Sequence, residues 1–213
     1  MRQALELGVD LVGGIDPATI DRDPIRHLET IFDLATHYDL GLDIHLHDPG
    51  DLGRWEIERI ADMTQAHGMA GRVMISHAYA LGGFPAADLT PLMDRLAALN
   101  ISIMTCAPAH FTVPPVAALR SRGVNVCSGS DGIRDAWGPM GNGDMLERAM
   151  LLALRFGWSK DADLAVAFDR ERRRRARWAC SITGWGRAAR PIWCWFRRKT
   201  LRQRCWSVRG NAR

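Results

Sequence analysis

The sequence lacks the long apolar run that a membrane helix requires. No stretch of its 213 residues approaches the roughly 18 consecutive apolar residues of a transmembrane segment. The first ten residues, MRQALELGVD, also lack the basic and then apolar order of a secretory signal peptide. We therefore expect a cytoplasmic chain with no membrane partner, whose 47% of hydrophobic residues can form one sizeable core.

Cysteine pairs and nucleotide-binding glycine motifs are absent as well. The five cysteines are odd in number and include no CxxC pair, which argues against a disulfide framework and a zinc knuckle. No GxGxxG or GxxxxGK[ST] motif follows any apolar run, so the sequence gives little support to a nucleotide-binding open sheet.

Charge divides the chain into two predicted segments. Residues 1–169 carry a net charge of −10, whereas residues 170–213 carry +14 and five of the eight tryptophans. The basic tail has three interpretations: a nucleic-acid-binding module, a solvated interaction arm, or a segment translated out of frame. We favour the third, because arginine, tryptophan, cysteine and glycine are typical products of GC-rich DNA in a wrong frame. The tail does not look native, and a nucleic-acid partner is disfavoured.

Residues 1–169 alternate between short apolar runs and segments of helical period. Strands are predicted at 9–15, 41–47, 72–79, 100–107 and 125–131, and helices at 24–38, 54–67, 86–99, 113–120 and 143–156. Successive strands start about 24 to 32 residues apart, the size of one βα unit. This rhythm predicts an α/β fold with about five βα units and a parallel sheet.

Polar side chains gather where four of these predicted strands end. The strand in LDIHLHDPGD is followed by His45 to Asp48, and the next three strands end at Ser76 and His77, at Thr105 and Cys106, and at Ser128 to Asp131. Function collects at the carboxyl ends of parallel strands, so we expect these groups at one rim.

The ordered set DIHLHD, ISHAYAL and CSGSDGIRDAW resembles the amidohydrolase superfamily, in particular its cytosine deaminase-like branch. With GVDLVGGI and PMGNGDML, the resemblance covers about residues 5 to 168. It implies strands 4 to 8 of a TIM-type (β/α)8 barrel of the metal-dependent hydrolase kind. The implied activity is hydrolysis of C–N bonds other than peptide bonds, most simply deamination of a small, cytosine-like nitrogen heterocycle.

The resemblance also implies a site for one divalent ion, zinc or iron, which activates water. His45 and Asp131 would be its ligands, His77 would polarise the substrate or hold the activated water, and Asp131 would also accept a proton. Asp48 stands where the family usually has a glutamate that shuttles a proton to the leaving group, and its shorter side chain departs from that pattern.

Several further residues have both a functional and a structural interpretation. His110 could reach the pocket mouth and Trp137 could cover a planar ring, although both could simply pack. His47 could support the site or belong to a loop, and Asp51 is a second candidate for the proton shuttle. Cys106 is interpreted as a small core residue.

No HxH pair precedes His45, although the family uses such a pair on its first strand. We therefore expect an internal fragment of an enzyme, with weak metal binding and negligible hydrolysis until the missing strands and the downstream frame are restored. The alternative to an active enzyme is an inactive, truncated remnant. A homo-oligomer is compatible with the sequence.

Overall fold

The computed structural model describes residues 2–168, which form one five-stranded sheet. All neighbouring strands are parallel, and their order in the sheet is their order along the chain. The strands are β1 (Leu11–Ile15), β2 (Gly41–Leu46), β3 (Val73–His77), β4 (Ser102–Thr105) and β5 (Asn125–Ser128).

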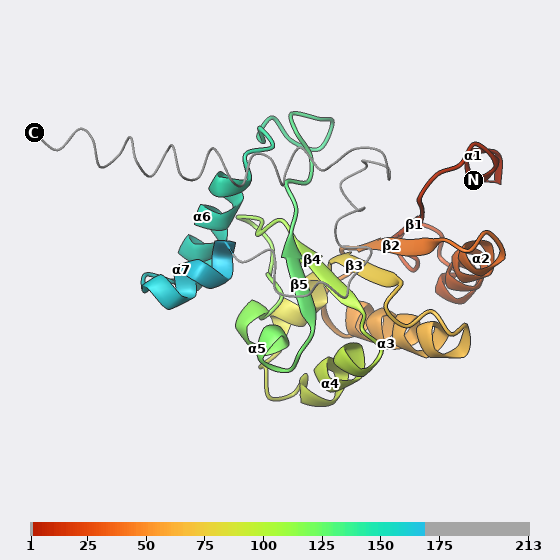
Figure 1. Cartoon of the computed structure of the whole chain (residues 1–213), viewed down its shortest axis with the longest axis horizontal. Helices are drawn as coiled ribbons and strands as arrows, with labels where there is room; N and C mark the ends of the chain where they lie inside the picture. Colours follow the sequence, from red (N-terminus) through yellow and green to blue (C-terminus); the bar gives the residue numbers. More distant parts are fainter. Residues whose placement is uncertain (1, 169–213) are drawn as a thin grey trace, which may run out of the picture.

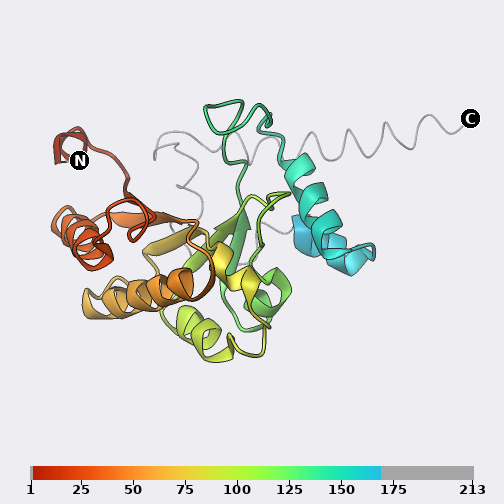
Figure 2. The ribbon, with the colours of Figure 1, turned by 180° about the vertical axis from the view of Figure 1, so that it is seen from behind.

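Helices connect the strands and cover one side of the sheet. Figures 1 and 2 show α2 to α5 in an arc along this side, while α6 and α7 follow β5. This is the arrangement of part of a (β/α)8 barrel, so the predicted fold class is confirmed. The helices are α1 (Arg2–Glu6), α2 (Pro24–His37), α3 (Gly50–Ala66), the 3-10 helix η1 (Tyr79–Gly83), α4 (Thr90–Ala98), α5 (Val116–Ser121), α6 (Met145–Phe156) and α7 (Asp161–Phe168).

Helix α2 illustrates how local sequence sets an element. It begins with Pro24 and is capped by Asp23, whose carboxylate accepts a hydrogen bond from the Arg26 amide at 3.1 Å. Its apolar residues recur every three or four positions, which places them on one face against the sheet. The buried members of this face are Leu28, Ile31, Phe32 and Ala35.

The two faces of β2 differ in polarity. Leu42, Ile44 and Leu46 are buried and belong to the main core, which the sheet forms with its covering helices. Asp43 and His45 alternate with them and therefore lie on the opposite face. On that face the Ser76 hydroxyl donates to Asp43 at 2.6 Å. On β2 the face away from the helices is thus polar, and His45 stands near the carboxyl end of this strand.

The five predicted strands are confirmed to within a few residues at either end. The predicted helix at 54–67 begins four residues earlier, at Gly50, because Pro49 and Gly50 concealed its first turn from the sequence pattern. Helices α1, η1 and α7 were not predicted, since each is too short to show a period. Among the described helices, none has the length and apolarity to span a membrane. The predicted basic tail at 170–213 lies outside the described residues.

Gly53 brings helix α3 unusually close to the segment that follows β2. A Cβ atom added at this residue would lie 1.9 Å from the Asp48 carbonyl oxygen and 2.9 Å from the Ala80 Cβ atom. The nearest of these atoms belongs to the Asp48 backbone, which cannot move aside as a flexible side chain would. Gly53 therefore fixes the distance between α3 and Asp48.

We predict that Gly53→Ala lowers the free energy of unfolding by about 1–3 kcal/mol or more, the usual effect of overpacking a rigid site. In an unobstructed helix the same change would stabilise by about 0.5–1 kcal/mol. Gly83→Ala is the control, because a Cβ there meets nothing within 4 Å, and its effect should stay within about 0.5 kcal/mol. Denaturant titration measures both, and equal stability of the two variants would contradict the prediction.

Candidate metal centre

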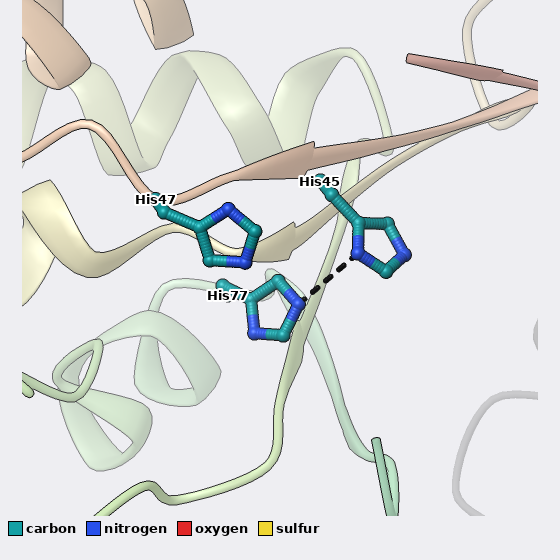
Figure 3. Close-up of side chains that lie close together, drawn as sticks. All are labelled: His45, His47 and His77. Atoms are coloured by element: carbon teal, nitrogen blue, oxygen red, sulfur yellow. Dashed lines mark hydrogen bonds between the residues drawn. The ribbon is translucent and has the colours of Figure 1, made fainter. Parts of the chain in front are cut away.

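His45 and His77 approach each other from neighbouring strands. In the pairing of β2 with β3, His45 lies opposite Ser76 and Leu46 lies opposite His77. The His45 Nδ1 and His77 Nε2 atoms are 3.2 Å apart, so one ring can donate a hydrogen bond to the other (Figure 3). The structure thus brings together the two histidines that the sequence singled out.

The backbone at the end of β3 explains how His77 reaches this position. Side chains alternate along a strand, and by that alternation His77 would follow Ile75 toward the helices. Instead His77 has φ = 73° and Ala78 has φ = 46°, both in the left-handed region. Such conformations cost on the order of 1–3 kcal/mol for residues other than glycine and concentrate at functional sites. The turn at His77 directs its ring to His45.

His47 also joins the cluster, with Asp16 behind it. The Asp16 carboxylate accepts hydrogen bonds from the His47 backbone amide at 2.6 Å and from its ring Nδ1 at 2.8 Å. Hydrogen bonding to Asp16 raises the pKa of His47 against the opposing effect of burial. Burial opposes ionisation of Asp16, but its hydrogen bonds with His47 lower its pKa overall. With Nδ1 committed to Asp16, the Nε2 of His47 is left for the cluster, and its ring centre lies 4.3 Å from that of His77.

Asp131 and Cys106 also lie next to the His77 ring. The Asp131 carboxylate is 3.9 Å from His77 Nε2, and the Cys106 sulfur is 3.8 Å from His77 Nδ1. Burial, together with the nearby Asp131 charge, raises the pKa of the Cys106 thiol to about 11. Cys106 is buried, as the sequence indicated, but it lies beside the histidine cluster rather than in an apolar core.

The electrostatics of His77 favour a neutral imidazole. Burial lowers the pKa of His77 to about 4; Asp131 acts in the opposite direction, and His47 and His45 add to the lowering. His77 is therefore uncharged near pH 7. An uncharged imidazole offers a nitrogen lone pair, which is the state that coordinates a metal ion.

Asp48 directly follows His47 in the segment after β2 and acts on the charge of its ring. It is buried, and its Oδ1 accepts a hydrogen bond from the Thr19 hydroxyl. The neighbouring Glu56 on α3 is fully buried and accepts a hydrogen bond from the Ala18 amide at 2.9 Å. Asp51 is exposed in the first turn of the same helix. Of the two predicted shuttle candidates, Asp48 is the one that the fold encloses.

An aromatic pair stands next to the cluster. Tyr79 is buried, and its ring centre lies 5.4 Å from that of His77 and 5.5 Å from that of His47. Phe111 stacks on Tyr79 with ring centres 5.0 Å apart and planes nearly parallel, yet it remains 58% exposed. The sequence suggests two other residues for the substrate site, His110 at the pocket mouth and Trp137 over a planar ring. Of these, His110 is exposed next to Phe111, and Trp137 is 91% exposed.

The residues present fit a divalent metal ion. Two sets of three side chains each bring their ligand atoms within 4.8 Å of one another, and His77 belongs to both. Imidazole nitrogens and a carboxylate are the ligands that zinc and iron take in proteins. The two sets are His45, His47 and His77, and His77, Cys106 and Asp131.

The fold and this cluster define an α/β barrel-type protein with a candidate metal centre at the carboxyl ends of its strands. Residues 1–189 match the model of the amidohydrolase family. The chain is 36% identical over 166 residues to N-isopropylammelide isopropyl amidohydrolase of Pseudomonas sp. (strain ADP), covering 78% of this chain and 41% of that enzyme. The chain belongs to the amidohydrolase family.

Two solved structures resemble the chain. One is N-isopropylammelide isopropylaminohydrolase from Burkholderia multivorans, with 41% identity, a TM-score of 0.79, and coverage of 86% of this chain and 47% of that chain. The other is 5-methylcytosine deaminase from Klebsiella pneumoniae bound to 5-fluorocytosine, with 27% identity, a TM-score of 0.66, and coverage of 79% and 47%. The chain thus spans less than half the length of these relatives.

Sequence reasoning did not identify four residues of the site: Asp16, Glu56 and the aromatic pair Tyr79 and Phe111. Asp16 directly follows the strand-like run GVDLVGGI, and a polar residue in that position could have been noticed. Glu56 lies inside a helix among other charged residues, and the sequence shows no sign that it is buried.

We predict that Asp16→Ala lowers the free energy of unfolding by about 1–3 kcal/mol, because it leaves two partly buried donors of His47 unpaired. Asp16→Asn should recover much of this loss, since asparagine keeps an acceptor and tolerates the φ of 38° at this residue. Asp94→Ala is the matched control: Asp94 also pairs with a cation, at 2.5 Å from the Arg122 guanidinium, but both side chains are more than one-third exposed. It should cost less than about 1 kcal/mol. Thermal and denaturant unfolding measure all three, and an equal effect of both alanine variants would count against the role of Asp16.

Proposed function

We propose that this chain forms part of a metal-dependent hydrolase that removes ammonia or an alkylamine from a planar nitrogen heterocycle. The observation that carries this proposal is the meeting of His45, His77 and Asp131 at the carboxyl ends of β2, β3 and β5. The related enzymes act on N-isopropylammelide and 5-methylcytosine, as their names state. Both are planar rings with an amine on a ring carbon.

His45 and Asp131 would hold the metal ion, and the neutral His77 would lie beside it as a further ligand or as the group that polarises the substrate. A zinc or iron ion bound here would act as a Lewis acid that lowers the pKa of water to about 7. Asp131 is suited to take up the proton of the attacking water, because its carboxylate lies next to His77. Asp48 is the candidate donor of a proton to the leaving amine.

A planar substrate is supported by the aromatic pair beside the histidines. Phe111 presents an exposed ring face, and its stacking on Tyr79 fixes the orientation of that face. Planar heterocycles gain stabilisation by stacking on such a ring in an offset or tilted arrangement. We add Phe111 to His110 and Trp137 as residues proposed to contact the substrate.

We predict that the chain binds zinc and that His45→Ala, His77→Ala and Asp131→Ala each weaken binding at least tenfold, since each removes one of few ligands. Isothermal titration with zinc gives the affinities. His37→Ala is the control, because His37 lies in the last turn of α2, where it contacts Tyr38 instead of the cluster. Zinc binding that is unaffected by His45→Ala and Asp131→Ala would contradict the proposed function.

A second prediction concerns the substrate class. In the presence of zinc, 5-fluorocytosine or N-isopropylammelide should raise the midpoint of thermal unfolding, whereas ribose, which is not planar, should leave it unchanged. Phe111→Ala should reduce this shift, because it removes the exposed stacking face. Release of ammonia or isopropylamine is followed in the same samples, where Asp48→Ala should slow any turnover by about 10²–10⁴-fold. Release that is independent of metal would contradict the mechanism.

A further inference from the structure

Two carboxyl groups from different segments, those of Asp48 and Glu56, are buried and interact with each other. Asp48 follows β2 and is 5% exposed, and Glu56 lies one turn beyond Gly53 in α3 and is 0% exposed. The Asp48 and Glu56 side chains lie within hydrogen-bonding distance of each other. Two ionised carboxylates in such a place would repel each other and lose their hydration.

In each of these two carboxyl groups, one oxygen atom accepts a hydrogen bond and the other does not. Asp48 Oδ1 accepts from the Thr19 hydroxyl, and Glu56 Oε1 accepts from the Ala18 amide. The second oxygen of each group, Asp48 Oδ2 and Glu56 Oε2, is buried and has no donor among the described residues. Buried polar atoms are rarely left unsatisfied. One proton placed between these two oxygens would satisfy both.

We propose that Asp48 and Glu56 share one proton through these two oxygens, and that Glu56 is the positioning residue and proton store for Asp48. The pair then carries a single negative charge. The Glu56 hydroxyl donates to Asp48 Oδ2, while the Thr19 hydroxyl fixes the other oxygen of Asp48. Like-charge carboxyl pairs that share a proton are a known solution for buried acids.

The surroundings favour the protonated form of Glu56. Burial raises the pKa of Glu56 to about 7; the Ala18 amide opposes this, while the charge of Asp48, its hydrogen bond with Glu56 and the charge of Asp16 raise it further. The titratable groups that act on Glu56 are Asp48 after β2 and Asp16 after β1, and His47 interacts with both of these acids. His47 is paired with Asp16 and so reduces the effect of that carboxylate on Glu56.

The consequence for turnover rests on the proposed function, although the shared proton itself does not. In hydrolysis of an amine from a ring, the attacking water loses one proton and the leaving amine gains one. The single proton of the pair passes from Glu56 to Asp48 and on to the leaving amine, and the proton that Asp131 takes from the attacking water then returns to the pair. Protons therefore balance over one cycle without exchange with bulk solvent.

The first experiment follows stability against pH in the metal-free full-length chain. A folded pKa near 7 exceeds the ordinary value of 4.5, so Glu56 contributes stability that is fully present below about pH 4.5 and is lost as the pH rises to about 7. In Glu56→Gln the amide oxygen can accept from Ala18 and the amide nitrogen can donate to Asp48. The folding equilibrium constant of this variant, divided by that of the unchanged chain, should therefore rise on the order of 10²-fold from pH 4.5 to pH 8.

Glu58→Gln is the matched control. Glu58 lies on the same helix, is about one-third exposed and pairs with Arg54. The ratio between the folding equilibrium constants of Glu58→Gln and of the unchanged chain should therefore stay nearly constant with pH. If Glu56→Gln also shows a constant ratio, the shared proton is wrong.

A second experiment observes the proton directly and does not depend on the folding of Glu56→Gln. Carbon-13 NMR of the glutamate carboxyl groups should show Glu56 titrating near pH 7, and Asp48→Asn should move this midpoint downward by removing the neighbouring charge. Titration near pH 4.5, or a midpoint that Asp48→Asn leaves in place, would overturn the pair. Zinc binding tests the proposed function alone, so either proposal can fail without the other.

Discussion

The parallel pairing of β2 with β3 is the constraint on which the rest of the site depends. Because Leu46 lies opposite His77, the ends of the two strands meet at the same height, and the rings of His45 and His77 come into contact. A shift of the register by one residue would reverse which side chains of β2 face the helices. The apolar residues Leu42, Ile44 and Leu46 prevent such a shift, since it would expose them and bury Asp43. The core and the site are therefore specified by the same pairing.

Left-handed backbone conformation at the strand ends is the second constraint on the site. Residues other than glycine adopt it after four of the five strands, at Asp16, His77, Ala107 and Asp131. Each such residue is strained, and the strain persists only because surrounding contacts fix it. For Asp16 these contacts are the two hydrogen bonds with His47, and for His77 they are burial and the neighbouring rings. The site is thus held rigid at the points where its side chains leave the sheet.

The sequence allowed the sheet and the histidines to be predicted, because both depend on local order. Apolar runs of strand length identify the strands, and parallel topology then requires that His45 and His77 lie at the same rim. The left-handed turn at His77 could not be predicted, since only a small minority of histidines adopt positive φ, although histidine does so more often than most residues. Nor could the buried position of Glu56, whose carboxylate contacts the distant Ala18 amide. Contacts between distant segments decide both features.

The distribution of charge explains why three acids can stand behind one cluster. Asp16 is balanced by His47, whose pKa it raises, and in the proposed state Glu56 is neutral because it holds the shared proton. Asp48 then keeps one negative charge within reach of a site suited to a divalent cation. With all three acids ionised, mutual repulsion and lost hydration would oppose folding of the segments after β1 and β2. A pairing with histidine and a shared proton remove this conflict while leaving both Asp16 and Asp48 as acceptors. The arrangement that avoids repulsion among these acids therefore also keeps proton-transfer groups close to His47.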